Sequence, residues 1–281
     1  MVKRSVILVF LWVLLSPTGT FGVAMPKIFS NHMVLQRDQP ITLWGWGDPL
    51  ELISIHLGPL MEQVKVGKNG KWILDLAPMS AGGPYVLIVK GRESELIFEN
   101  ILIGDLWICS GQSNMEWTND QFHYQETDTT FLKTNIRLFK VSIDMDYLPQ
   151  EDLKGGTWQL LDEETMGNFS AVSYYFGKNL SSEIDVPIGL INVSLGSSSI
   201  EAWMSNDALV KFPQFKEEVN TIVSNNKSFE ELRIDFEKGK EKWSKKHYLK
   251  DIRLDLQWFA KQLYDSDWPE MKVSGFWEEL D

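Results

Sequence analysis

The sequence predicts an α/β protein in which a small antiparallel β-sandwich precedes a parallel α/β domain. Two observations lead to this fold. Residues 25–102 contain about seven short apolar or alternating runs, separated by glycine, proline and asparagine. From residue 103 onward, apolar strand-like runs alternate with helical segments, which is the pattern of a parallel sheet.

The expected strands of the sandwich are short and alternate between apolar and polar residues. Asn69-Gly70 lies between two of them, and this dipeptide is typical of a tight hairpin turn, so we expect the flanking strands to pair. The strands are predicted at residues 34–36, 41–44, 52–56, 63–66, 72–74 and 85–90.

The α/β domain is predicted to begin with the apolar run ILIGDLWIC at residues 101–109, which resembles a strand buried on both faces. Cys109 ends this run and is expected to be a buried thiol. Two further strands are predicted at residues 136–141 and 189–193, and a helix at residues 170–181 leads into the second of them. Residues 206–264 are charged and helical, and 229–247 resemble a solvated helix.

The composition is that of a folded protein with an acidic surface. Hydrophobic residues make up 43% and charged residues 23% of the 281 residues. The formal net charge of −12 repels phosphate backbones and no basic run offsets it, so we do not expect nucleic acid as a partner. The chain also has 12 Trp, 15 Phe and 7 Tyr, whose flat faces suit stacking on sugar rings, although most are expected in the core.

Residues 1–24 are predicted to be a signal peptide. Two basic residues precede an apolar run at residues 5–15, and Gly22-Val23-Ala24 then provides a cleavage site with small residues. The run is too short to cross a bilayer, so we expect a mature protein that begins near Met25 and has no membrane span. Cys109 is the only cysteine, and an exported protein without disulfides fits a bacterial periplasm or secretion from a bacterium.

The motif SGQSNM at residues 110–115 is the strongest candidate for catalytic chemistry. A nucleophilic serine needs a sharp strand-to-helix turn, which exposes its hydroxyl and its backbone N–H, and Ser113 lies where such a turn is expected. Gly111 would relieve crowding there. Met115 replaces the second glycine of the G-x-S-x-G elbow, so these residues alone also allow an ordinary polar turn.

A second candidate loop follows the strand IGLINVS at residues 188–194. It reads LGSSSIEAWM at residues 195–204. Loops after parallel strands lie at the carboxyl edge of the sheet, where ligands bind, and Gly196 can direct a backbone N–H toward an oxyanion. Taken alone, a purely structural loop is the alternative.

Together these segments resemble the sialate O-acetylesterase family, whose members are SGNH-type carbohydrate esterases with a flavodoxin-like α/β domain. IGDLWICSGQSNME at residues 103–116 is similar to the first signature block of the family, and residues 196–204 are similar to the second. FSNHMVLQR at residues 29–37 and AGGPY at residues 81–85 are similar to its N-terminal β-domain.

The resemblance implies a mechanism and a set of site residues. Ser113 would attack the acetyl carbonyl, the backbone N–H groups of Ser113 and Gly196 would stabilise the oxyanion, and water would hydrolyse the acetyl-serine. No metal or organic cofactor is implied. Residues that would border the oxyanion or the sugar are Gln112, Asn114, Ser197, Glu201 and Trp203, the last two of which either shape the sugar pocket or only anchor the loop.

The sequence departs from the family pattern in two ways. Ser197 stands where the family usually has a second glycine, which would narrow or redirect the loop. The Q-G-E-x-N block and the C-terminal D-x-x-H block, which supply an oxyanion-hole asparagine and the catalytic base, are absent. We therefore expect an incomplete SGNH-type domain at residues 103–264, with 265–281 starting an inserted β-sandwich, in a C-terminally truncated chain.

The histidines of the chain are weak candidates for the missing base. Asp120 and His123 have the D-x-x-H spacing, but His123 follows Ser113 too closely to face it across the sheet edge. His32, His56 and His247 have weaker claims. The predicted function is thus a serine esterase that removes O-acetyl groups from sialic acid or related sugars, inactive in this form. A xylan or pectin acetylesterase and a non-catalytic carbohydrate-binding remnant are the alternatives.

Overall fold

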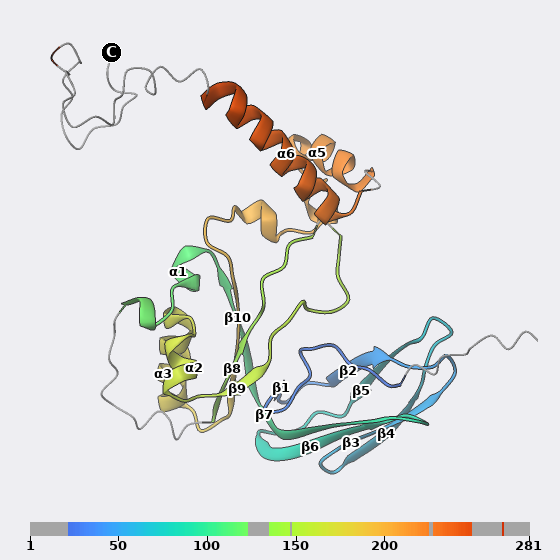
Figure 1. Cartoon of the computed structure of the whole chain (residues 1–281). Helices are drawn as coiled ribbons and strands as arrows, with labels where there is room; N and C mark the ends of the chain where they lie inside the picture. Colours follow the sequence, from blue (N-terminus) through green and yellow to red (C-terminus); the bar gives the residue numbers. More distant parts are fainter. Residues whose placement is uncertain (1–21, 123–134, 147, 225–226, 249–265, 267–281) are drawn as a thin grey trace, which may run out of the picture. The chain divides into compact units, whose positions relative to one another are not determined.

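Two layers of strands form the N-terminal β-sandwich in the computed structural model, which describes residues 22–122, 135–146, 148–224, 227–248 and 266. A two-stranded antiparallel sheet of β2 and β5 packs over a larger sheet (Figure 1). In the larger sheet β4, β3, β6 and β7 are antiparallel neighbours, and β1 runs parallel to β7. The strands are β1 (Val34–Gln36), β2 (Ile41–Trp46), β3 (Leu52–Leu57), β4 (Leu60–Lys65), β5 (Lys71–Leu76), β6 (Gly82–Lys90) and β7 (Glu95–Gly111). The predicted strands are confirmed. The parallel pairing of β1 with β7 was not predicted, because the sequence indicated an antiparallel sandwich.

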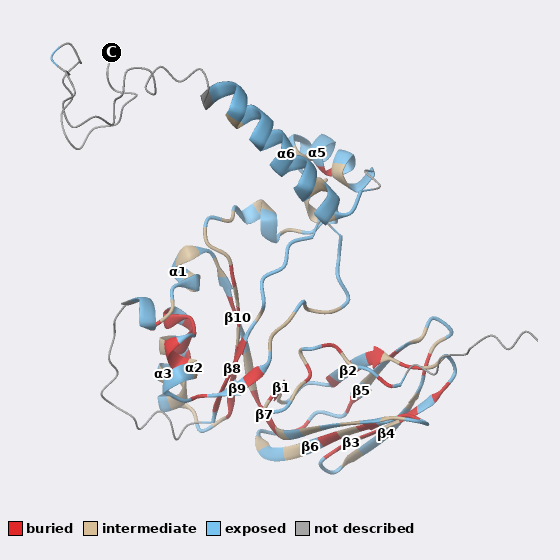
Figure 2. Cartoon of the chain, in the orientation of Figure 1, coloured by how far each residue is buried: buried red, intermediate tan, exposed pale blue. Residues whose placement is uncertain are grey.

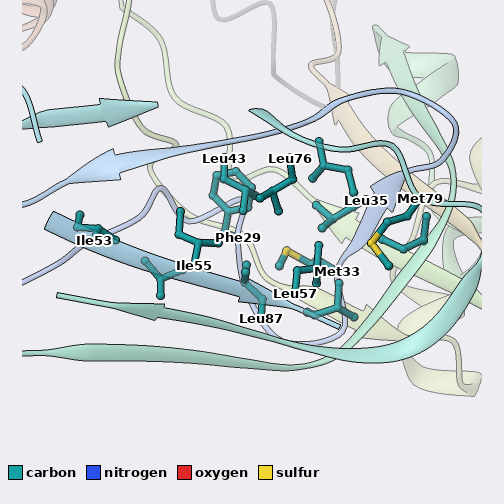
Figure 3. Close-up of a cluster of buried hydrophobic side chains, with 14 of the residues drawn as sticks. Phe29, Met33, Leu35, Leu43, Ile53, Ile55, Leu57, Leu76, Met79 and Leu87 are labelled. Carbon is teal, nitrogen blue, oxygen red and sulfur yellow. The ribbon is translucent and has the colours of Figure 1, made fainter. Parts of the chain in front are cut away.

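The core of the sandwich lies between the two layers because alternate side chains of each strand point inward. In β2, Ile41 and Leu43 are buried whereas Thr42 and Trp44 are exposed. Figure 2 shows the buried residues along the strands. The inward side chains form one apolar cluster (Figure 3), which includes Phe29, Met33, Leu35, Leu43, Ile53, Ile55, Leu57, Leu76, Met79 and Leu87.

The predicted pairing across Asn69-Gly70 is wrong. β4 pairs with β3 across the two-residue turn Gly58-Pro59, whereas β5 pairs with β2 in the other layer. Gly58 has φ of +53°, which suits the first position of a type II′ hairpin turn and costs glycine little. Gly70 does close a turn, donating its N–H to the carbonyl oxygen of Gly67 at 3.0 Å. Turn residues reverse the chain, but they do not decide which strand it pairs with afterwards.

β7 is a long strand that belongs to both the sandwich and a parallel sheet. Residues 95–103 pair with β6, and residues 105–111 pair in parallel with β10 (Ile188–Ser194). β10 pairs in parallel with β8 (Ile136–Lys140), which pairs antiparallel with the short β9 (Trp158–Leu160). The strand therefore runs through the position of the domain boundary predicted at residues 102 and 103.

Helices α2 (Glu163–Gly167) and α3 (Ala171–Glu183) follow β9, and α3 covers one face of the parallel sheet (Figure 1). The predicted helix is confirmed, and the hydroxyl of Ser170 caps it by accepting the N–H of Ser173. A Cβ on Gly177 would lie 2.6 Å from Leu190, so glycine is what allows α3 to approach β10 so closely. The resulting second core cluster includes Ile136, Leu138, Tyr174, Ile188 and Leu190.

The prediction that residues 101–109 form a strand buried on both faces is wrong for residues 107 and 108. Ile101 and Ile103 are buried, but Trp107 is 43% and Ile108 is 72% exposed. The sandwich core cluster includes Phe139 and Trp158 and packs against Leu106 and Ile191, but it leaves Ile108 exposed. An apolar run shows that a strand is favoured there, but coverage of its faces depends on distant segments. Cys109 itself is buried, as predicted.

The remaining helices divide between two compact units, Met1–Val219 and Asn220–Asp281. The first unit contains α1 (Ser113–Glu116), the 3₁₀ helices η1 (Asp120–Phe122) and η3 (Ile200–Trp203), α4 (Asn206–Leu209) and the first half of α5 (Pro213–Ser224). In the second unit, α6 (Phe229–Tyr248) is exposed along most of its length, as predicted for residues 229–247 (Figure 2). No helix among the described residues is long and apolar enough to cross a membrane.

Several predictions fall outside the described residues: most of the signal peptide, helical structure at residues 249–264, and an inserted sandwich at 265–281. The described end of the predicted signal peptide, residues 22–24, belongs to the sandwich. Val23 is buried in the core, and its N–H donates to Oγ of Ser94 at 2.6 Å. Ala24 exchanges two backbone hydrogen bonds with Trp46, each 2.9 Å long.

Candidate functional site at the carboxyl edge of the parallel sheet

The two predicted loops meet at one edge of the parallel sheet. β7 and β10 run in register up to Gly111 and Ser194, and the N–H of Leu195 donates to the carbonyl oxygen of Gly111 at 3.1 Å. Ser113 follows the end of β7, and Gly196 follows the end of β10. A Cβ built on Gly196 would lie 3.7 Å from Cβ of Ser113, so the two residues are neighbours.

Ser113 is the first residue of the one-turn helix α1 and is half-buried. Its carbonyl oxygen accepts the N–H of Trp117 at 3.0 Å, which closes the turn. Its backbone N–H, like the first N–H groups of any helix, has no intrahelical acceptor, and it has no other acceptor among the described residues. Gln112 and Asn114 flank Ser113 and are exposed. The turn thus presents a serine hydroxyl and an available N–H donor side by side.

The N–H of Gly196 is directed at an anion beside Ser113. It donates a hydrogen bond of 2.6 Å to Oε2 of Glu116, which lies 80 residues earlier in the sequence. A short hydrogen bond to a carboxylate is stronger than one to a neutral acceptor. The donor that the sequence assigns to the oxyanion is therefore able to bind a negative oxygen, and in this structure the Glu116 carboxylate accepts its hydrogen bond.

A buried polar cluster lies beneath α1 and joins it to the sheet. Nδ2 of Asn192 donates to the carbonyl oxygens of Cys109 at 3.3 Å and Met115 at 3.5 Å, and Oδ1 of Asn192 accepts the hydroxyl of Ser194 at 3.2 Å. Ser173 of α3 contacts Sδ of Met115 at 3.3 Å. Asn192 therefore ties the end of β7 to the helix that begins with Ser113.

Cys109 adjoins this cluster but has no exposed thiol. Burial raises the pKa of its thiol, and a hydrogen bond with Ser173 opposes that shift less strongly. A thiol in this state is neutral at physiological pH and a poor nucleophile.

Ser197 has a backbone conformation that explains why a glycine is usual at its position. Its φ is +62°, in the left-handed region that a Cβ disfavours. The next residue, Ser198, anchors the loop instead: its hydroxyl donates to the carbonyl oxygen of Leu195 at 2.6 Å and accepts the indole N–H of Trp203 at 2.9 Å. Trp203 thus anchors the loop while remaining 40% exposed. Glu201 is half-buried, and hydrogen bonds with Ser199 and with its own backbone lower its pKa.

No imidazole lies beside Ser113 among the described residues of the first unit. His32 bonds to Nδ2 of Asn100 in the sandwich, and His56 lies in β3. His247 belongs to the second unit, and His123 lies outside the described residues. Asp120 begins η1, next to Gly167.

Sequence reasoning missed Glu116 and Asn192 as contributors to this edge. Asn192 carried a signal, because it is a polar residue in the middle of the apolar strand IGLINVS. No sequence pattern pointed to Glu116, because its contact with Gly196 depends on how the two strand ends pack.

Comparison with known proteins gives consistent results. A family model described as carbohydrate esterase, sialic acid-specific acetylesterase, matches residues 103–234. The sialate O-acetylesterase of Mus musculus is 31% identical over 217 residues, which are 69% of this chain and 40% of the mouse protein. The sialate O-acetylesterase of Homo sapiens is 31% identical over 208 residues, covering 67% of this chain and 40% of the human protein.

A solved structure shares the fold as well as the sequence pattern. A carbohydrate acetylesterase from Xanthomonas citri superposes with a TM-score of 0.62 and 38% identity, over 66% of this chain and 43% of that one. The chain therefore spans about 40% of the length of the curated relatives it matches.

Proposed function

The chain belongs to the sialic acid-specific acetylesterase family of carbohydrate esterases, and we propose that its parallel sheet edge carries the serine site of an esterase that removes O-acetyl groups from sialic acid or related acetylated sugars. The observation that carries this proposal is the pairing of Ser113 with the anion-binding N–H of Gly196. A nucleophile and an oxyanion donor at one point are the minimum that acyl transfer requires.

The proposed reaction proceeds in two steps. Oγ of Ser113 attacks the acetyl carbonyl carbon and loses its proton to a base, and the negative oxygen is bound by the N–H groups of Ser113 and Gly196. The bond to the sugar oxygen then breaks, the sugar leaves with a proton, and an acetyl-serine remains. Water attacks this ester, releasing acetate and restoring the Ser113 hydroxyl.

In the proposed site, the Glu116 carboxylate occupies the hydrogen-bonding position that the substrate oxygen would take. Its carboxylate accepts the N–H of Gly196 at 2.6 Å, so the carbonyl oxygen of a substrate must replace it during attack. Because Glu116 is exposed, its carboxylate can turn into water without leaving a buried charge behind.

We propose that these 281 residues alone turn over acetyl esters slowly. The only D-x-x-H pattern in the sequence is at residues 120–123, close behind Ser113. Serine hydrolases without a base retain only the smaller rate enhancement that binding and the oxyanion hole supply. Turnover at the rate of a full-length relative, lost on replacement of His123 by alanine, would overturn this part of the proposal.

Acetate release from O-acetylated sialic acid and from acetylated xylan tests the proposal. Ser113→Ala should abolish whatever rate the chain has, whereas Ser110→Ala, an exposed serine three positions earlier, should leave the rate unchanged. Equal rates for Ser113→Ala and the unmodified chain would refute the assignment of Ser113. The two substrates distinguish a sialate esterase from a xylan-type acetylesterase, because the proposed acyl chemistry is common to both.

We also propose that the chain is exported from a bacterium. The basic and apolar start of the sequence and the single cysteine support this. The burial of Val23 and the pairing of Ala24 with Trp46 favour cleavage before Val23, since cleavage after Ala24 would remove both from the sandwich.

A further inference from the structure

The outer face of the β2–β5 sheet bears an exposed aromatic and aliphatic centre between polar pairs. Trp44 lies opposite Ile73 in the antiparallel register, and the two side chains are 38% and 67% exposed. On one side, the hydroxyl of Thr42 donates to Asp75 at 2.6 Å. On the other side, Lys71, opposite Trp46, forms an ion pair with Glu151.

A cavity of about 560 Å³ adjoins this face and extends past the sheet to Val64 and Lys65 of β4 and to the inner-side Trp72; its volume is within the size range of small-molecule sites. The residues that line it combine apolar rings with hydrogen-bonding groups. They include Trp44, Trp46, Ile73, Asn69, Lys71 and Glu151.

Trp44 and Ile73 together form a platform, which contacts within the chain hold in place before any ligand binds. The ring of Phe29 meets the ring of Trp44 edge-on, with centroids 4.7 Å apart and planes at 75°. On the inner side of the sheet, the indole N–H of Trp72 donates to the carbonyl oxygen of Trp46 at 3.2 Å. Glu151 is fixed by Lys71 and by the side chain of Trp46, and both lower its pKa, Lys71 more strongly. Preorganised rings and charges lose little conformational entropy on binding.

We infer that this cavity is a glycan-binding site in which a pyranose ring stacks on Trp44 and its hydroxyls bond to the flanking polar side chains. A pyranose has an apolar C–H face and a rim of hydroxyls, which matches an exposed indole bordered by carboxylate, ammonium and amide groups.

This site is separate from the edge that carries Ser113. It lies on β2, β4, β5, the turn between β4 and β5, and the loop containing Glu151, whereas Ser113 and Gly196 follow β7 and β10. The inference goes beyond the proposed esterase activity: the cavity would hold a glycan chain independently of the acetyl chemistry.

Calorimetric titration of the full chain with xylohexaose and with 3′-sialyllactose tests the inference. Neither glycan carries an O-acetyl ester, so failure to bind would leave the esterase proposal standing. Both present pyranose rings, and comparing their affinities separates a neutral from an acidic ligand. We expect at least one of them to bind, and binding of neither at millimolar concentration would overturn the inference.

Two variants identify the platform. Trp44→Ala and Ile73→Glu should each weaken binding by about tenfold or more, the first by removing the stacking ring and the second by placing a charge beside it. Ile73→Glu guards against misfolding, since Ile73 is 67% exposed. Ile97→Glu, at a 51% exposed isoleucine of β7, is the matched control and should bind within about twofold of the unmodified chain. Unchanged affinity in both platform variants would refute the assignment, and so would an equal loss in Ile97→Glu.

Discussion

Asn192→Leu should destabilise the first unit because Asn192 is the polar link between β7, β10 and α1. The side chain is 3% exposed and makes two hydrogen bonds, to the carbonyl oxygen of Cys109 at 3.3 Å and from the hydroxyl of Ser194 at 3.2 Å. Its contacts with Met115 and Ser173 are both 3.5 Å long and weak. Leucine has the same number of side-chain heavy atoms with the same branching, so the substitution removes the bonds without opening a cavity.

The expected magnitude follows from these contacts. Each buried partner left unsatisfied costs about 1–3 kcal/mol. Burial of the apolar leucine side chain offsets this by about 1.5–3 kcal/mol. The net loss should be about 2 kcal/mol in the free energy of unfolding.

Urea denaturation followed by tryptophan fluorescence measures this loss. Asn179→Leu is the matched control, because Asn179 is an exposed residue of α3 and its replacement should change stability by less than about 0.5 kcal/mol. The reasoning is refuted if the two variants unfold at the same urea concentration, since burial and hydrogen bonding of Asn192 would then contribute nothing.

Three further predictions follow from the loop, the thiol and the N-terminus. Ser197→Gly should stabilise the chain by about 0.5 kcal/mol in the same urea assay, because relief of the left-handed strain at φ +62° exceeds the added entropy of the unfolded chain. Ser198→Gly should instead destabilise it. If Ser198→Gly proved more stable than Ser197→Gly, the assigned role of the backbone at Ser197 would be contradicted. The raised pKa of Cys109 keeps its thiol neutral, so a disulfide reagent at pH 8 should modify the native chain much more slowly than the urea-unfolded chain. Equal modification rates in the native and unfolded chains would show that the thiol is accessible. The stability that this buried neutral thiol contributes is fully present below the pKa of the unfolded chain, near 9.0, and is lost as the pH rises above that value. N-terminal sequencing of exported protein should find a first residue at Val23 or earlier, and a start at Met25 would mean that the sandwich folds without the Val23 contacts.

The local pattern of residues was enough to predict the strands and their inward faces. Alternation of apolar and polar residues sets which side chains of β2 point inward, and this property depends only on the two-residue period of a strand. The motif at Ser113 was also recognisable, because the turn it needs is built by neighbouring residues. The resemblance to a known family rested on the same contiguous segments.

Contacts between distant segments were decided only by the tertiary structure. Asn69-Gly70 specified a turn but could not specify that β5 joins β2 rather than β4. The hydrogen bond from Gly196 to Glu116 spans 80 residues, and the cavity beside Trp44 is completed by Glu151 from a remote loop. Short-range patterns determine backbone conformation and the side a residue faces. Which side chains come into contact on that face depends on how the layers pack against each other, and this packing is a property of the whole fold.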